Sequence, residues 1–172
     1  ARLQIRTMEN KNHMAFWSAI GAEPTPLAWG EVYLSLQSGT IDAQENAADT
    51  CVGANFNEVQ KYIACTNHIL YLNQICMNKA AYDSLPEELQ SALRAAVSDA
   101  IAYMRPQLAD IDAESKKKLE MGGMTVIEYN DTFYDSILAL DGVKALYEKI
   151  NGEVNGLGDL LAEELHEVRN QD

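Results

Sequence analysis

The sequence lacks a long apolar run and is poor in positive charge. None of its apolar stretches reaches the roughly 20 residues that a membrane-spanning helix needs. Its 172 residues carry 13 Lys and Arg against 26 Asp and Glu, a net charge of −13. This balance argues against nucleic-acid binding and against a polybasic membrane anchor, because both need a basic face. It does not exclude an anionic ligand, since a few local cations decide the charge of a pocket.

Motifs of catalysis and of metal binding are also missing. The chain has no Ser/His/Asp order, no metal-ligand spacing, no glycine-rich phosphate loop and no nucleophile with an evident base. His13 and His166 lie far from His68 in the sequence, which argues against a histidine metal site. We therefore expect no enzyme, no metal and no cofactor.

Cysteine is scarce, and Cys51, Cys65 and Cys76 show no CxxC spacing. An odd count leaves at least one thiol unpaired within a monomer. Buried free cysteines that act as small hydrophobic residues are the favoured interpretation. A Cys65–Cys76 disulfide is the alternative, and it depends on the separation of the two Cα atoms.

The composition that is present suits a folded domain, or a domain and a half, because 47% of the residues are hydrophobic. The chain opens at Ala1 without Met and without the pattern of a signal peptide. We expect an internal start, either of a fragment or of the ordered part of a longer protein.

Strand-like and helix-like segments alternate along the chain, which predicts an α/β layered fold. Strands are expected at 3–7 and 124–129, and one or two more within the apolar stretch 63–77. Helices are expected at these segments: 9–20, 31–38, 47–55, 131–138, 142–150 and 157–168. A long helix should run from Pro86 to Met121, with a kink near residues 102–105 because Pro106 lies inside it.

A run of short motifs carries a resemblance to a known family. The motifs are Ile5-Arg6-Thr7, Gly21-Ala22, Pro24-Thr25-Pro26, Glu31-Val32-Tyr33, Leu36-Gln37, Ile41-Asp42, Gln44-Glu45-Asn46, Glu58-Val59-Gln60-Lys61-Tyr62, Thr66-Asn67-His68-Ile69 and Ser84-Leu85-Pro86-Glu87. In this order they resemble the solute-binding proteins of TRAP transporters, the DctP family. The sequence departs from the family at Ala43 and Ala47, which replace a glycine and a proline.

The resemblance implies a two-lobed α/β fold of the periplasmic-binding-protein type II, which closes on a ligand in its cleft. Residues 1–71 and 112–172 would form the second lobe, and residues 72–111 would complete the first lobe. The N-terminal portion of the first lobe is expected to be missing from this chain. The long kinked helix would be a domain-spanning element. We expect exposed apolar surface on residues 72–111, or self-association through it.

The resemblance also implies ligand contacts. Arg6 would grip the ligand carboxylate through its planar fork of donors, whereas an arginine outside this motif would most often be a solvated or structural one. Trp29 would pack against the ligand, or lie half-buried between sheet and helix. Asn46 would orient the ligand through its amide, and it could also cap the next helix.

Three further residues complete the site that the resemblance implies. Glu9 would accept hydrogen bonds from ligand hydroxyls, although the favoured alternative is an acid at the start of a helix. His68 is interpreted as a supporting or hinge histidine. Gln44 would shape the loop that presents Asn46.

The function implied is capture of a small organic acid outside the cytoplasmic membrane and its delivery to the membrane subunits of a TRAP permease. A sensor component that presents its ligand to a receptor is the alternative. The location would be periplasmic, or membrane-associated in a Gram-positive host. The ligand would be a carboxylate, with a hydroxylated acid such as a sugar acid favoured over a bare dicarboxylate.

Overall fold

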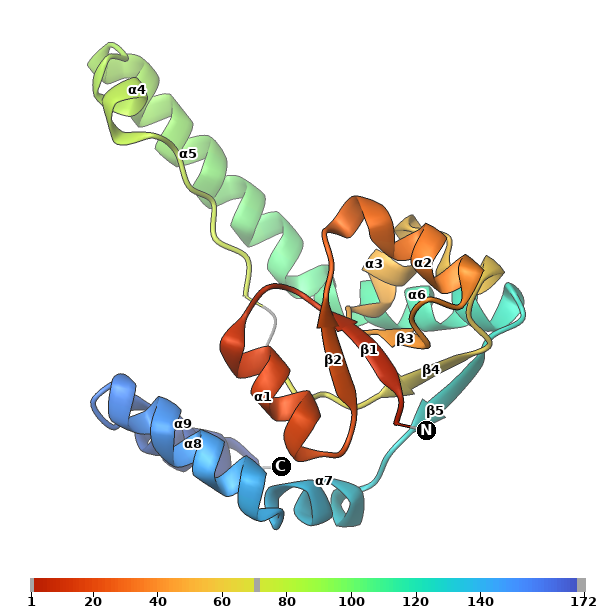
Figure 1. The fold of residues 1–172 in the computed structure, drawn as a ribbon. Helices are drawn as coiled ribbons and strands as arrows, with labels where there is room; N and C mark the ends of the chain where they lie inside the picture. Colours follow the sequence, from red (N-terminus) through yellow and green to blue (C-terminus); the bar gives the residue numbers. More distant parts are fainter. Residues whose placement is uncertain (1, 70–71, 170–172) are drawn as a thin grey trace. The chain divides into compact units, whose positions relative to one another are not determined.

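A three-stranded parallel sheet organises the first of two units into which the chain divides (Figure 1). The computed structural model describes residues 2–69 and 72–169, and only the backbone of residues 165–169. The first unit comprises residues 1–45 and 128–172, and the second comprises residues 46–127. The units are described separately below.

The sheet of the first unit has the order β2-β1-β3. Its strands are β1 (Gln4–Thr7), β2 (Glu23–Pro26) and β3 (Ala43–Gln44). Arg6 in the central strand lies opposite Thr25 on one side and Gln44 on the other. Parallel neighbours need a crossover connection. The helix α1 (Lys11–Ala19) supplies it between β1 and β2, and α2 (Val32–Ser38) lies between β2 and β3.

Local sequence signals explain where these helices begin and end. The Asn10 side chain caps α1 by accepting hydrogen bonds from the backbone N–H groups of Asn12 and His13. A 3₁₀ turn, η1 (Trp29–Glu31), leads into α2, and Gly39 ends α2 at φ 72°, where glycine is favoured. Ala43, which stands where the family has glycine, is not among the residues with positive φ.

The core of this unit lies between β1 and α1. Ile5, Trp17 and Ala22 form a buried cluster, on which further apolar side chains pack: Phe16, Ile20 and Ala43. Burying a large apolar side chain such as Ile5 contributes about 1.5–3 kcal/mol. Because residues alternate in a strand, a buried Ile5 on one face leaves Arg6 to the other face.

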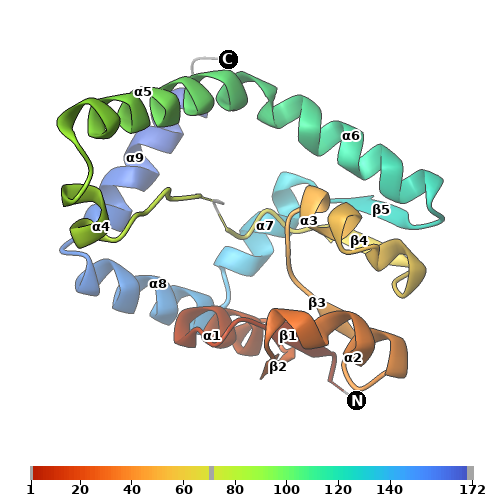
Figure 2. The same ribbon diagram turned by 90° about the horizontal axis from the view of Figure 1, so that it is seen from above.

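Three helices complete the first unit: α7 (Asp131–Leu138), α8 (Asp141–Glu153) and α9 (Leu157–Arg169). They confirm the three helices predicted for this region. α8 packs against α1 and α9 (Figure 2). The contact between α8 and α1 is close, since a Cβ on Gly142 would lie 3.0 Å from the Cβ of Ala19.

The second unit is mostly helical. Its elements are α3 (Ala48–Gly53), η2 (Phe56–Glu58), β4 (Tyr62–Cys65), α4 (Lys79–Asp83), α5 (Glu87–Met104), η3 (Arg105–Gln107), α6 (Leu108–Met121) and β5 (Thr125–Glu128). α3 packs on α6, where Cys51 and Leu119 are buried. β4 pairs with β5 in a two-stranded sheet.

The kink predicted for the long helix is confirmed. α5 stops at Met104, the 3₁₀ turn η3 contains Pro106, and α6 starts at Leu108 (Figure 2). Proline has no N–H for the helical hydrogen bond, and its ring clashes with the carbonyl four residues earlier. The Gly122-Gly123 pair ends α6, with Gly123 at φ 94°.

The structure decides two expectations about the second unit. One or two strands were expected in the apolar stretch 63–77, and the described part of it contains one, β4, whereas 66–69 and 72–77 form no strand. Residues 72–77 are exposed. All three cysteines are free thiols, with Cys51 and Cys65 buried and Cys76 exposed, so the alternative Cys65–Cys76 disulfide is wrong.

The predicted apolar surface on residues 72–111 is present. Large exposed side chains on it are Leu72, Ile75, Met77, Leu89, Leu93, Ile101, Tyr103, Met104 and Leu108. Within the described ranges, no helix combines the length and apolarity needed to cross a membrane. The assignment of residues 1–71, 72–111 and 112–172 to lobes stays a prediction.

Candidate ligand-binding site

The carboxyl ends of the three parallel strands lead to two of the predicted site residues, Glu9 and Trp29, and to Glu45. β1 leads to Glu9, β2 leads to Trp29, and β3 leads to Glu45. β1 is the central strand, with β2 on one side of it and β3 on the other, so the strand order reverses at β1. In open α/β sheets, ligands bind outside the carboxyl ends of the strands at such a topological switch point. The topology therefore favours a ligand site beside Arg6.

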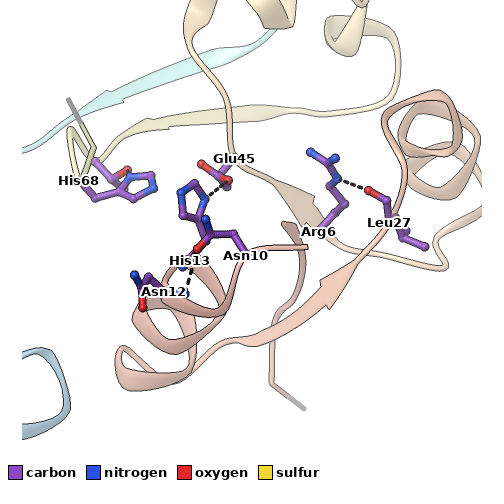
Figure 3. Close-up of polar contacts among 8 residues, drawn as sticks. Arg6, Asn10, Asn12, His13, Leu27, Glu45 and His68 are labelled. Carbon is purple, nitrogen blue, oxygen red and sulfur yellow. Dashed lines mark hydrogen bonds and ion pairs between the residues drawn. The ribbon is translucent and has the colours of Figure 1, made fainter. Parts of the chain in front are cut away.

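Arg6 is buried in the central strand and is only 4% exposed. Its Nε donates a hydrogen bond to the backbone oxygen of Leu27 at 2.9 Å (Figure 3). Neither terminal nitrogen of Arg6 has a hydrogen-bond acceptor among the residues that the structure describes. These nitrogens are not among the fully buried side-chain atoms that lack a partner, so they remain accessible to a ligand or to water.

Two opposing effects act on the charge of Arg6. Burial lowers the pKa of its guanidinium, and the nearby Glu45 carboxylate raises it. An arginine remains protonated in proteins despite such shifts. The edge of the sheet therefore presents a fixed, partly desolvated cation, which suits an anionic ligand group.

Trp29 lies directly over this cation. The guanidinium carbon of Arg6 is 5.8 Å from the centre of the Trp29 ring, within the range of a cation–π contact. Trp29 is the first residue of η1 and is 48% exposed. Its half-exposed ring can supply an apolar wall beside the guanidinium.

A histidine–carboxylate pair next to Arg6 was not predicted from the sequence. His13 Nδ1 lies 3.2 Å from Glu45 Oε1, and the two side chains are 21% and 11% exposed (Figure 3). The two residues are 32 positions apart, and no local motif links them. Only the parallel topology brings the first turn of α1 to the end of β3. The contact could therefore have been predicted only from the strand order and not from a sequence motif.

The remaining predicted residues are placed as follows. Gln44 is the last residue of β3 and pairs with Arg6 in the strand register. Asn46 is the next residue after Glu45 and the first of the second unit. The N-cap of α3 is Ala47, so the alternative of Asn46 as that cap is wrong. Asn46 is half-buried.

Glu9 and His68 complete the set of predicted residues. Glu9 is exposed and precedes the N-cap Asn10, and the first turn of α1 contains no acidic residue, so Glu9 is not a first-turn acid. His68 belongs to the second unit, where its Nδ1 lies 2.7 Å from Thr66 Oγ1. In the described ranges, no three His, Cys, Asp or Glu side chains are close enough together to hold a metal ion.

Known proteins place this chain in a family. The DctP family, described as "bacterial extracellular solute-binding protein, family 7", matches residues 1–149. A solute-binding protein of Verminephrobacter eiseniae is 37% identical over 151 residues, which cover 88% of this chain and 45% of that protein. The 2,3-diketo-L-gulonate-binding periplasmic protein of Escherichia coli is 34% identical over 73% of this chain and 38% of its own length.

A solved structure agrees with these sequence matches. The TRAP periplasmic solute-binding protein of Roseobacter denitrificans with bound L-galactonate is 32% identical, with a TM-score of 0.78. The similarity covers 93% of this chain and 52% of that one. It confirms the predicted α/β fold class of the two-lobed binding proteins. This chain spans about half the length of the relatives that it matches, and it belongs to the DctP family of bacterial extracellular solute-binding proteins.

Proposed function

We propose that this chain forms the carboxylate-binding part of a TRAP-transporter solute-binding protein. In this function the protein captures a small organic acid outside the cytoplasmic membrane and delivers it to the membrane subunits of a TRAP permease. The family consists of solute-binding proteins, which are not enzymes. The relatives named above include a periplasmic one, which supports an extracytoplasmic location.

One observation carries the proposal: Arg6 is buried near the carboxyl ends of the strands, and its two terminal nitrogens are available to a ligand. Its Nε is occupied by Leu27, while the terminal nitrogens meet no acceptor in the described chain. A carboxylate matches this geometry, because a guanidinium offers parallel donors at the spacing of two carboxylate oxygens. Arg6 would then be the clamp for the acid group.

The other site residues would shape the rest of the ligand pocket. Trp29 would form an apolar wall beside the clamp, and Asn46 would orient the ligand through its amide. Glu9 would accept hydrogen bonds from ligand hydroxyls, which its exposure permits. Gln44, paired with Arg6 in the strand register, would support the loop that leads to Asn46.

A hydroxylated acid is favoured over a bare dicarboxylate. Trp29 offers a flat apolar face of the kind that packs against a sugar ring or chain, and Glu9 offers acceptors. Two of the relatives named above bind acids of this class, L-galactonate and 2,3-diketo-L-gulonate. His68, which is hydrogen-bonded to Thr66, would act as a supporting residue and would not contact the acid group.

The apolar surface on residues 72–111 suggests a further element of this function. We propose that in the full-length protein it is covered by the remainder of the first lobe. Expressed alone, residues 1–172 should then self-associate through this surface. Sedimentation velocity across a concentration series tests this, and a strictly monomeric species at all concentrations would contradict it.

The function is tested by a thermal-shift screen of the full-length protein. The panel is L-galactonate, D-glucuronate, D-galacturonate and succinate, each measured with the wild-type protein and with Arg6→Ala. A ligand that binds only the folded state raises its stability by about 2.7 kcal/mol at 100 times its Kd. We expect sugar acids to raise the Tm of the wild-type protein and not that of Arg6→Ala. No shift with any acid would refute the proposal.

A further inference from the structure

The Arg6 guanidinium can hold a carboxylate in two ways: side-on, through Nε and one terminal nitrogen, or end-on, through both terminal nitrogens. In this structure Nε already donates to the backbone oxygen of Leu27 at 2.9 Å (Figure 3). A carboxylate that bound side-on would have to displace that oxygen. The terminal nitrogens have no acceptor among the described residues and are not fully buried, so the end-on pair is the one left to a ligand.

The short segment after β2 holds Arg6 from two directions. Besides the Leu27 oxygen on Nε, the ring of Trp29 lies with its centre 5.8 Å from the guanidinium carbon. The first contact occupies one edge of the planar group, and the second covers one face. Two contacts of different direction restrict a side chain that otherwise has many rotamers. Arg6 therefore loses this freedom on folding and not on binding, which favours affinity.

Leu27 is itself anchored on both sides. Its N–H donates to the backbone oxygen of Thr7 at 3.4 Å, one step beyond the paired residues Thr7 and Pro26. The backbone oxygen of the next residue, Ala28, accepts a hydrogen bond from the Glu31 N–H at 3.0 Å, where η1 begins. Pro26 adds stiffness because its ring fixes φ, and β2 is an edge strand, where proline is tolerated. The Leu27 oxygen therefore comes from a backbone that the strand and the 3₁₀ turn hold in place.

We propose that Leu27 is a positioning residue of the acid clamp: its backbone oxygen holds Nε of Arg6 and so aims the two terminal nitrogens at the ligand carboxylate, which binds end-on. This inference rests on the proposed function, because it concerns the same site. Leu27 acts through Arg6 and does not touch the ligand. The Pro24-Thr25-Pro26 motif gains a role from it, since the stiff end of β2 carries the positioning oxygen.

A purely structural role of this hydrogen bond has a different consequence. If the bond only fastened the end of β2 to β1, weakening it would lower the free energy of unfolding and leave the preference of the site for an acid unchanged. If the bond aims the terminal nitrogens, weakening it reduces the affinity for an acid more than the affinity for an uncharged ligand of the same shape. The primary amide of a sugar acid is such a ligand, because it keeps the hydroxyls and lacks the charge.

The most direct variant replaces Ala28 by lactic acid, which turns the peptide bond between Leu27 and Ala28 into an ester. An ester oxygen is a weaker hydrogen-bond acceptor than an amide oxygen, and no side chain changes. The Ala28 N–H that is lost donates no backbone hydrogen bond among the described residues. Calorimetry on the full-length protein gives Kd for L-galactonate and D-glucuronate and for the primary amide of each. The tighter acid should bind the ester variant about threefold to tenfold more weakly than the wild type, and its amide within about twofold.

A matched pair of substitutions at the same position keeps the test open if the ester variant does not fold. Ala28 has a φ of −63°, the value that proline fixes, so Ala28→Pro preserves the orientation of the Leu27 oxygen. Ala28→Gly frees this angle. Ala28→Pro should bind the acid within about twofold of wild type and Ala28→Gly about threefold more weakly, with the affinity for the amide unchanged in both.

Three results would overturn the proposal: wild-type affinity of the ester variant for the acid, an equal loss for acid and amide, or a crystal structure of the complex in which the carboxylate binds Nε of Arg6. Failure of the proposed function has a different signature. Then the wild-type protein binds neither acid, or Arg6→Ala binds as tightly as wild type, and the inference about Leu27 falls with it. A normal dependence on Arg6 with no effect of the ester rejects only the inference.

Discussion

The ring of Trp29 covers the guanidinium of Arg6, with 5.8 Å between the ring centre and the guanidinium carbon. The two residues come from neighbouring strand ends, 23 positions apart, yet they form one surface at the edge of the sheet. Arg6 is buried while Trp29 is half-exposed. The pair therefore combines a buried positive charge, from Arg6, with an accessible apolar surface, from Trp29. This pairing suits a ligand with an acid group and a flat or ring-shaped body.

The Trp29 side chain should matter for affinity more than for stability. Trp29→Ala removes the wall and the cation–π contact, which is worth about 0.5–1 kcal/mol at an exposed site. We expect the Kd for the best acid of the panel to rise about threefold to tenfold, measured by calorimetry. Trp29→Phe keeps an aromatic face and serves as the matched control. An unchanged Kd in Trp29→Ala would show that the ring is not part of the site.

The packing of α8 on α1 provides a test of the first unit. Gly142→Ala places a Cβ 3.0 Å from the Cβ of Ala19 and 3.4 Å from its Cα, so a neighbour must shift. Overpacking of this kind costs about 1–3 kcal/mol, which outweighs the helix-propensity gain of about 1 kcal/mol from replacing glycine. The expected result is a lower free energy of unfolding in denaturant titrations.

Gly152→Ala is the control for that variant in the same helix. A Cβ at Gly152 meets nothing within 4 Å among the described residues, so only the propensity gain remains. We expect Gly152→Ala to be neutral or stabilising. If both variants shift stability in the same direction by the same amount, the contact between α8 and α1 is not as close as described here.

The stability that the contacts between α8 and α9 contribute should fall at alkaline pH. The Tyr147 hydroxyl donates a hydrogen bond to Asp159 Oδ1 at 3.0 Å, and Asn151 Nδ2 donates to Asp159 Oδ2 at 2.7 Å. Desolvation, followed by the hydrogen bond to Asp159 and its charge, raises the pKa of Tyr147. A raised pKa stabilises the fold below the unfolded pKa of about 10, and this contribution is lost as pH rises through the folded value.

Ultraviolet titration of the tyrosine checks this directly. The difference spectrum between the wild type and Tyr147→Phe isolates this residue from the seven other tyrosines. Its midpoint should lie above that of a free tyrosine, and Asp159→Asn should move it down. If Asp159→Asn left the titration midpoint unchanged, the hydrogen bond and the charge of Asp159 would not be what raises the pKa of Tyr147.

Much of the fold could be predicted from local signals. Pro106 interrupts the long helix where expected, because a missing N–H acts at its own position whatever surrounds it. Gly39 and Gly123 end helices for an equally local reason, since each adopts a positive φ. Signals of this kind need no knowledge of the tertiary structure.

The sequence was less informative where the outcome depended on distant partners. One or two strands were expected within the apolar stretch 63–77, and the described residues contain one, β4, because an apolar run becomes a strand only where another strand pairs with it. Residues 72–77 are exposed and form none. The contact between His13 and Glu45 was missed for the same reason, because only the crossover topology brings the two together.

The candidate site was accessible mainly through the family resemblance. The motif around Arg6 predicted a carboxylate clamp, and the structure adds its burial, its bond to Leu27 and its contact with Trp29. Composition alone indicated an acidic α/β domain. The ligand contacts of Glu9, Asn46, Gln44 and His68 stay predictions.

The central claim is that Arg6 grips a carboxylate, and calorimetry with a matched pair of ligands tests it most directly. The full-length protein and its Arg6→Ala and Arg6→Lys variants are titrated with L-galactonate and with its primary amide, which keeps the hydroxyls but lacks the charge. Two charge-assisted hydrogen bonds are worth about 3–6 kcal/mol together. Arg6→Ala should therefore weaken acid binding at least about hundredfold.

Arg6→Lys should recover only part of the affinity, since an ammonium lacks the planar fork. The amide should bind weakly to the wild type and equally weakly to both variants. Circular dichroism establishes that the variants are folded, which matters because Arg6 also donates to Leu27. This pattern is the predicted result. Acid binding by folded Arg6→Ala with wild-type affinity would contradict the account.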